Sequence, residues 1–313
     1  MKRKQKQTGQ SHSVLLTVTA FCLAGAAFMF LWFFQFKAHV QTVPVNGARI
    51  AYYVRGQGQT LLINQGFGMT MTDMDPLFIE SLSKHFMVVI YDYRGGGLST
   101  GSVEQLTVQQ MTDDAVMLLK HLGIQKASVF GWSYGTLIAQ DMAVRYPHSV
   151  EKLVLASPLP GGTQGIPADR SVQLFVQKHL AEDWESAFVP LLFLKNEDGE
   201  KAKTAYLARL KRARQSDELP RTPGIPVNTK IAQEYAAAGE DMAHLFESVQ
   251  TITAPTLILS SEDDMLVKPE NAKKIARQIP SAQLRMVTNA GHGFLFQDPR
   301  KEAREIMHFL DAK

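Results

Sequence analysis

A serine flanked by two glycines is the first residue in this sequence whose surroundings suggest chemistry. Ser133 lies in the segment Gly-Trp-Ser-Tyr-Gly at residues 131–135, after an apolar run and before a helix-prone stretch. A serine hydroxyl is an effective nucleophile only when a base takes its proton and donors stabilise the oxyanion. A tight turn from strand to helix meets these needs, because it exposes the hydroxyl beside the N–H groups that begin the helix. The strand before and the helix after therefore predict that Ser133 is a nucleophile.

The base could come from any of nine histidines, and one of them is placed suitably. His292 lies in the glycine-flanked loop 289–294, directly after the last predicted strand. An imidazole at that position can project over the carboxyl edge of the sheet. The other histidines lie at predicted helix ends, in the segment 159–250 or beside the amino-terminal apolar run, and we expect them to be surface or boundary residues.

A carboxylate that orients the imidazole should follow a strand and precede the histidine. Three adjacent acids, Glu262, Asp263 and Asp264, follow the apolar run that ends near residue 260. One of them should accept the imidazole N–H and stabilise the imidazolium that forms during attack. Chemistry alone leaves the choice open between a catalytic acid and solvated loop charges; we favour Asp264, then Glu262.

Short apolar runs alternate with helical stretches from about residue 41 onward. Candidate strands are 60–64, 87–91, 127–131, 153–156, 256–260 and 284–287, and candidate helices are 77–85, 108–122, 136–146, 269–279 and 299–309. Near-continuous apolar runs are typical of strands that helices cover on both faces. The alternation therefore predicts an α/β fold with a doubly wound, mostly parallel sheet.

Residues 159–250 interrupt this alternation, since they are helix-prone, charged and without a clear strand. We predict a helical lid at 159–250, inserted between two parts of the core at 41–158 and 251–313. The basic stretch 201–214 is expected to be a solvated helix face rather than an anion-binding patch.

The amino-terminal region predicts a membrane anchor. Residues 13–36 carry no formal charge, and a helix of that length can cross a bilayer. The basic residues within 1–12 favour a cytoplasmic tail, with the catalytic domain of a single-pass protein on the extracytoplasmic side. A cleaved signal peptide is the alternative, because small residues at 24–26 resemble a cleavage site.

Charge and composition exclude several other functions. Five of the 33 basic residues lie within 1–37, where no acid occurs. The rest of the chain therefore has 28 basic and 30 acidic residues. Because this part carries no excess of positive charge, we expect no nucleic-acid partner. The chain has no phosphate-binding GxxxxGK[ST] segment and no HxH or HExxH spacing, so we expect no nucleotide, cofactor or metal. The single cysteine, Cys22, allows no internal disulfide.

The order Ser133, Asp264, His292 resembles that of the α/β-hydrolase family. The resemblance covers about residues 45–158 and 252–313, and it rests on four segments: GWSYG at 131–135, DYRGGGLS at 92–99, SSEDDMLV at 260–267 and AGHGF at 290–294. In this family the catalytic acid is the last one before the apolar pair, which implies Asp264.

The same resemblance implies an oxyanion hole. The family takes one donor from the loop after an early strand, here 64–68, and the other from the residue after the nucleophile. The implied donors are the backbone N–H groups of Phe67 and Tyr134. Many members carry His-Gly where this chain has Gln65-Gly66.

Hydrolysis of carboxylic esters is the predicted activity. A serine at the elbow argues against epoxide hydrolases and haloalkane dehalogenases, relatives that carry an aspartate there. Ser133 would form an acyl-enzyme with a small-molecule ester, lipid-derived or otherwise hydrophobic. Water would then hydrolyse the acyl-enzyme. Met69, Met71 and Trp132 either line an apolar substrate pocket or belong to the core.

Two other functions are compatible with the sequence. An aminopeptidase or amidase of the proline iminopeptidase type needs carboxylates near the substrate's amino group. Candidates in the predicted lid are Glu182, Asp183, Glu185 and Glu197. The second alternative is a non-catalytic, membrane-anchored binding protein on a hydrolase fold, which the presence of all three catalytic residue types disfavours.

Overall fold

The structure is a computed structural model that describes residues 39–216, 218–239, 241–280 and 282–312. The predicted tail at 1–12 and the predicted membrane anchor at 13–36 lie outside the described residues. Within the described ranges, no helix combines the length and the apolar character needed to span a bilayer.

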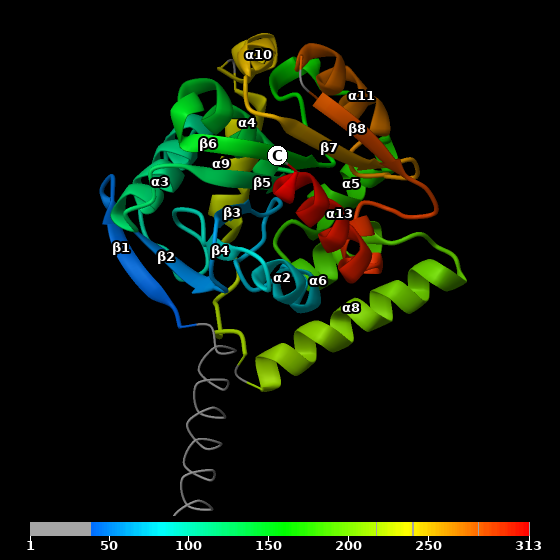
Figure 1. Cartoon of the computed structure of the whole chain (residues 1–313). Helices are drawn as coiled ribbons and strands as arrows, with labels where there is room; N and C mark the ends of the chain where they lie inside the picture. The colour runs from blue at the N-terminus through cyan, green and yellow to red at the C-terminus, as the bar shows by residue number, and fades with distance from the viewer. Residues whose placement is uncertain (1–38, 217, 240, 281, 313) are drawn as a thin grey trace, which may run out of the picture. The chain divides into compact units, whose positions relative to one another are not determined.

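An eight-stranded sheet forms the centre of the fold, in the order β1-β2-β4-β3-β5-β6-β7-β8 (Figure 1). The strands are β1 (Gln41–Val45), β2 (Ala48–Arg55), β3 (Thr60–Asn64), β4 (Met87–Tyr91), β5 (Ala127–Trp132), β6 (Val150–Ala156), β7 (Thr256–Ser261) and β8 (Ala282–Val287). Strand β2 is antiparallel to both of its neighbours, whereas β4, β3, β5, β6, β7 and β8 pair in parallel. The prediction of a mostly parallel sheet is confirmed.

The first two strands were not among the predicted ones. They form a hairpin whose turn residues, Asn46 and Gly47, both have positive φ, at 44° and 75°. Asn-Gly is the preferred pair for a two-residue turn between antiparallel strands. Strand β1 is an edge strand that contains Pro44 and exposes alternate residues, so it lacks the apolar run by which the buried strands were found.

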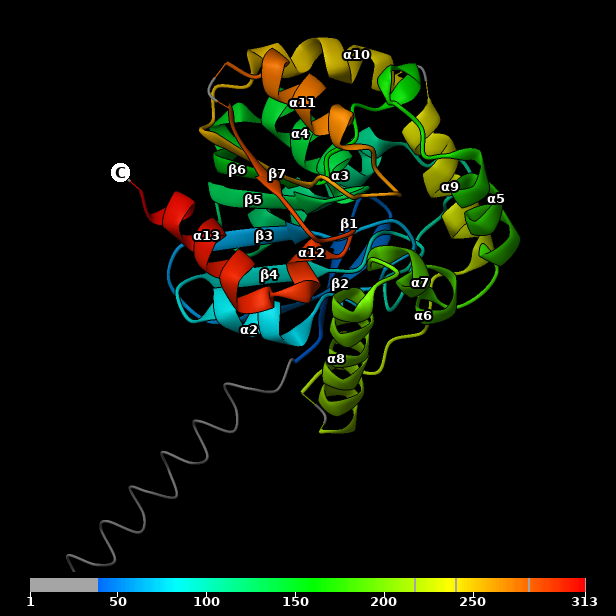
Figure 2. The ribbon, with the colours of Figure 1, turned by 90° about the vertical axis from the view of Figure 1, so that its right-hand side faces the viewer.

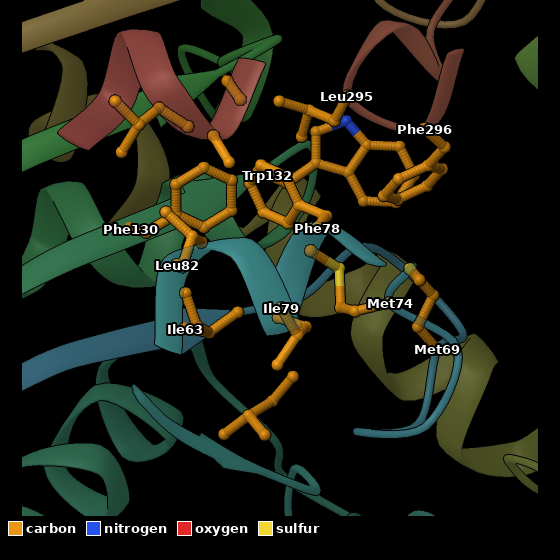
Figure 3. Packing of buried hydrophobic residues seen from close by; sticks show 14 of the residues in the cluster. Ile63, Met69, Met74, Phe78, Ile79, Leu82, Phe130, Trp132, Leu295 and Phe296 are labelled. Atoms are coloured by element: carbon orange, nitrogen blue, oxygen red, sulfur yellow. The ribbon is translucent and has the colours of Figure 1, made fainter. Parts of the chain in front are cut away.

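Helices cover both faces of the sheet (Figure 2). On one face lie α2 (Pro76–Ser83), α12 (Phe294–Gln297) and α13 (Pro299–Asp311), and on the other lie α3 (Val108–His121), α4 (Gly135–Arg145) and α11 (Pro269–Gln278). Residues alternate between the two cores: Leu61 and Ile63 of β3 pack in the first, and Leu62 packs in the second. Figure 3 shows part of the first core, where α2 packs Phe78, Ile79 and Leu82 under the sheet.

The segment between β6 and β7 is helical and contains no strand among its described residues. Its helices are α5 (Arg170–His179), α6 (Trp184–Ala187), α7 (Val189–Leu192), α8 (Glu197–Gln215), α9 (Val227–Ala238) and α10 (Asp241–Ser248), with short 3-10 turns at η2 (Gly162–Gln164) and η3 (Val249–Thr251). A further 3-10 turn, η1 (Pro147–Ser149), lies directly before β6. Figure 2 shows α5, α6, α7 and α9 gathered beyond one end of the sheet. The role of this segment as a lid stays a prediction.

Helix α8 differs from the solvated helix that its basic stretch suggested. Lys201 pairs with Glu197 at the surface, as expected. Arg209, however, donates to both carboxylate oxygens of the fully buried Asp75, and Arg214 donates to Asp73 at 3.0 Å. The basic residues on this face therefore attach α8 to the loop before α2.

A buried ion pair provides a test of how the sheet and α3 are joined. Arg94 donates to both carboxylate oxygens of Asp114 at 2.8 Å, and the two side chains are only 4% and 2% exposed. Replacing Arg94→Ala leaves a buried carboxylate without its cation, so we expect the free energy of unfolding to fall by about 3–5 kcal/mol. Urea denaturation followed by circular dichroism measures this change.

The exposed pair of Lys84 and Glu80 provides the matched control, because Lys84 is 60% exposed. Lys84→Ala should change the free energy of unfolding by no more than about 0.5 kcal/mol. Equal losses in the two variants would contradict this account of the buried pair.

Candidate active site

The predicted catalytic residues all follow the carboxyl ends of neighbouring parallel strands. Ser133 follows β5, Asp264 follows β7 and His292 follows β8, while β6 lies between the first two of these strands. In a parallel sheet these strand ends share one edge, so residues distant in sequence come together there.

Ser133 occupies a strained turn. Its φ is 53°, in the left-handed region that non-glycine residues seldom adopt, and its N–H donates to the carbonyl of Ala156 at 2.8 Å. The flanking glycines are needed for a different reason, namely close backbone packing. A Cβ at Gly135 would lie 2.2 Å from the carbonyl oxygen of Asn64, and one at Gly131 would lie 2.6 Å from the carbonyl oxygen of Gly135. The turn therefore places the strain on the serine itself.

The imidazole of His292 contacts Asp264. Its Nδ1 lies 2.7 Å from Asp264 Oδ2, and the two residues are each 3% exposed. Because a carboxylate oxygen accepts, Nδ1 carries the proton, and Nε2 is left as the basic atom. Glu262 and Asp263, the other two candidates, are exposed. Of the three adjacent acids, Asp264 is thus the buried one that contacts the imidazole, and its catalytic role stays a prediction.

The indole of Trp132 supports the imidazole. The Trp132 and His292 rings lie 4.9 Å apart between centroids at 31°, and Trp132 also contacts Phe296 at 4.9 Å (Figure 3). Trp132, Met69 and Met71 are completely buried in the first core. These three side chains therefore pack in the core, and contact between any of them and a substrate stays a prediction.

The two residues proposed for the oxyanion hole adjoin one another. The rings of Phe67 and Tyr134 lie 6.1 Å apart, edge to face. Across the described part of the chain, neither backbone N–H donates to a protein acceptor. Gln65, which differs from the family pattern, fixes the loop instead: its Nε2 donates to the carbonyl of Tyr91 at 2.7 Å. Both N–H groups are thus available to an oxyanion.

The same loop is tied to the helical segment and to β4. Gln233 of α9 accepts the Gly68 N–H at 3.1 Å. Asp92, which follows β4, accepts the N–H of Met71 and the N–H of Leu98, each at 2.7 Å. Burial raises the pKa of Asp92 to about 7, and the two N–H donors oppose that rise.

A cavity of about 920 Å³ lies beside this loop. Ser133 and His292 do not line it; Gly68, next to Phe67, does. Its walls carry three linked threonine hydroxyls and several charged groups, including the ion pair of Asp73 and Arg214. The side chains that supply these polar groups are Thr70, Thr72, Asp73, Glu182, Asp183, Glu185, Arg214, Arg221, Thr222 and Lys230. Glu197, at the start of α8, does not line this cavity.

Sequence reasoning did not identify this polar cavity. Part of its lining comes from the loop after β3 and the rest from residues of the helical segment more than 100 positions later, so no local pattern marks it. Burial raises the pKa of Asp73 and lowers the pKa of Lys230. Among the described residues, no cluster of three or more histidine, cysteine or acidic side chains could hold a metal ion.

The raised pKa of Asp92 predicts a specific pH dependence of stability. Between its unfolded pKa of about 3.9 and its folded pKa of about 7, the folded chain holds a proton that the unfolded chain has released. The contribution of Asp92 to the free energy of unfolding is therefore greatest below this range and falls as the pH rises through it. Asp92→Asn, which cannot titrate, should lack this decline.

Urea denaturation of both proteins at pH 4.5 and pH 7.5, as convenient values near each end of the range, measures the effect. The stability of wild type relative to Asp92→Asn should be larger at the acidic pH. A difference that is the same at both pH values would contradict the raised pKa. Other titrating groups are shared by the two proteins and cancel.

The sequence matches known proteins along most of its length. The family model described as "alpha/beta hydrolase fold" matches residues 59–299. The protein named carbamate hydrolase RutD, from Caulobacter sp. (strain K31), is 28% identical over 258 residues, which cover 82% of this chain and 91% of that protein. Proline iminopeptidase PfmaB of Pestalotiopsis fici is 26% identical over 277 residues, 81% of this chain and 92% of that protein.

A solved structure leads to the same family. An alpha/beta hydrolase fold protein from Chitinophaga pinensis superposes with a TM-score of 0.76 at 26% identity, over 89% of this chain and 99% of that one. The family model spans well over half of the sequence, including the segments that carry Ser133, Asp264 and His292. The chain therefore belongs to the alpha/beta hydrolase fold family.

Proposed function

We propose that the protein is a serine hydrolase that cleaves carboxylic esters through an acyl-enzyme on Ser133. One observation carries this proposal: the buried pair of His292 and Asp264 stands at the same sheet edge as a serine held on a strained turn. Strain of this kind persists only where the surrounding structure enforces it, and it is concentrated at functional sites. Membership of a hydrolase family supports the same activity.

In the proposed mechanism each of these groups has a defined role. The Ser133 oxygen attacks the ester carbonyl carbon while His292 Nε2 takes the hydroxyl proton, and the carbonyl oxygen becomes an oxyanion held by the N–H groups of Phe67 and Tyr134. Collapse of this intermediate breaks the bond to the leaving alkoxide, which receives the proton from His292. A water molecule, deprotonated by His292, then attacks the acyl-enzyme. When this second intermediate collapses, His292 returns the proton to the Ser133 oxygen and the carboxylic acid is released. Asp264 keeps the proton on Nδ1 throughout.

The polar cavity favours short, polar esters over the hydrophobic esters suggested by the sequence. Gly68 lines the cavity and adjoins the proposed oxyanion donor Phe67, so a bound substrate can extend from the site into it. A long acyl chain there would remove threonine hydroxyls and charged groups from water without replacing their hydrogen bonds. The methionines that could have held such a chain are already packed in the core.

Turnover of p-nitrophenyl esters of increasing acyl length tests the proposal. We expect the wild type to hydrolyse the acetate and butyrate faster than the decanoate. Ser133→Ala should lower kcat at least about 1,000-fold, because the acyl-enzyme cannot form. Ser102→Ala, which changes an exposed serine on a loop, should retain full activity.

Labelling with a fluorophosphonate provides the second measurement. The adduct should form on Ser133 in the folded wild type and be absent in Ser133→Ala. Failure of folded wild type to react would overturn the serine-hydrolase proposal and favour a non-catalytic binding protein.

Amide hydrolysis is the second candidate, and the position of three lid carboxylates favours it. Glu182, Asp183 and Glu185 line the cavity beside the oxyanion loop, where they could meet a substrate ammonium group. A relative named proline iminopeptidase is 26% identical over 81% of this chain. Glu185, however, is already paired with Arg214, and Asp183 caps α6 through Ser186.

Direct comparison of substrates distinguishes the two candidates. We expect kcat/KM for p-nitrophenyl acetate to exceed that for prolyl-p-nitroanilide, and Glu182→Gln to leave the ester reaction unchanged. A preference for the prolyl amide that Glu182→Gln abolishes would instead establish the aminopeptidase.

A further inference from the structure

We propose that Ser157 is a positioning residue of the active site, whose hydroxyl holds the Asp264 carboxylate in the orientation that His292 requires. Ser157 directly follows β6 and is completely buried. Its Oγ donates to Asp264 Oδ2 at 2.8 Å, and that same oxygen lies 2.7 Å from His292 Nδ1. The kinetic consequence rests on the proposed function, whereas the contact itself does not.

The backbone around Ser157 links the nucleophile to the acid. The carbonyl of Ala156 accepts the N–H of Ser133 at 2.8 Å, and the N–H of Ser157 donates to the carbonyl of Leu259 in β7 at 2.7 Å. Strand β6 lies between β5 and β7 in the sheet. The end of β6 therefore fixes the distance between the turn that carries Ser133 and the loop that carries Asp264.

The conformation of Ser157 indicates that its hydroxyl has a role. Its φ is 46°, a left-handed value that glycine adopts without strain and serine does not. Glycine would supply no hydroxyl, so the strained serine gives the Asp264 carboxylate a donor that the unstrained residue would lack.

Ser157 also completes the set of donors around the carboxylate. Asp264 Oδ1 accepts the N–H groups of Leu266 and Val267 at 2.9 and 2.8 Å, so the hydroxyl and the imidazole share Oδ2. Without the hydroxyl, His292 Nδ1 is the only donor to Oδ2. The undivided charge on Oδ2 then attracts the Nδ1 proton more strongly. The carboxylate is also less firmly oriented, so the imidazole can turn and Nε2 is no longer aligned with Ser133.

Two variants separate the hydroxyl from the backbone. Ser157→Ala removes the hydroxyl and keeps the Cβ, and Ser157→Gly removes the hydroxyl but suits the left-handed φ. Ser260→Ala is the matched control, because Ser260 is also completely buried and its hydroxyl has no partner among the described residues. We expect kcat for p-nitrophenyl acetate to fall about tenfold in both Ser157 variants, with KM within about twofold of wild type, and no change in the control.

Proton NMR gives a reading that a merely structural role would not change. The low-field resonance of the His292 Nδ1 proton, assigned by its loss in His292→Gln, should move further downfield in both Ser157 variants and stay in place in Ser260→Ala. An unmoved resonance overturns the proposal. A loss of kcat in Ser157→Ala that Ser157→Gly does not share also overturns it, because the cause would then be the backbone.

Failure of the proposed function is distinguishable from failure of this inference. If the wild type hydrolyses no ester and its Ser133 resists the fluorophosphonate, the proposed function fails. The NMR arm then decides alone: a downfield displacement supports the role of Ser157 in holding the acid and imidazole, and an unmoved resonance overturns it.

Discussion

A carboxylate removed from water must find hydrogen-bond donors within the protein, and Asp264 has four. Two are backbone N–H groups of its own loop, one is the hydroxyl of Ser157 and one is the imidazole of His292. Burial of an unsatisfied charge would cost several kcal/mol, so these donors must be present together in the folded state. They come from the ends of three adjacent strands, and the need to satisfy one carboxylate therefore holds the edge of the sheet together where the chemistry is expected.

The helical segment is attached to this edge by polar contacts as well as by its apolar core. Gly293, beside the imidazole, donates its N–H to the carbonyl of Leu192 at 2.7 Å, and Gln233 accepts the N–H of Gly68. Further away, Arg209 and Arg214 of α8 bind carboxylates in the loop before α2. Directional contacts fix the register of one element on another more narrowly than apolar packing does. Both loops that flank Ser133 thus depend on the helical segment for their position.

The sequence predicted those parts of the fold whose signals are local. The apolar runs of six strands and the helical stretches of five helices are each contained in one short segment of the chain. The glycines beside Ser133 and His292 marked two turns where backbones pack closely. The edge hairpin lacked an apolar run, although its Asn46-Gly47 turn carried a recognisable signal.

The unpredicted parts depend on contacts between distant residues. Arg209 and Asp75 are 134 positions apart, and Ser157 and Asp264 are 107 apart, so neither contact leaves a pattern in any single segment. Residue type also could not show whether Met69, Met71 and Trp132 line a pocket or belong to the core, because apolar side chains suit both. Only the fold shows that they are buried. A hydroxyl on an ordinary serine gains a specific role only when topology places it against a charge.

Two serines with positive φ, Ser133 and Ser157, therefore belong to one arrangement. Each costs on the order of 1 kcal/mol or more relative to a relaxed backbone. Each is held by a backbone N–H that donates across to the next strand, to Ala156 in one case and to Leu259 in the other. The hydrogen bonds between the parallel strands thus hold both residues at their strained φ values. Neither turn would adopt this conformation without the sheet. Since the backbones of both serines are held by these hydrogen bonds between strands, a shift of β6 against either neighbour would alter the positions of Ser133 and Asp264 together.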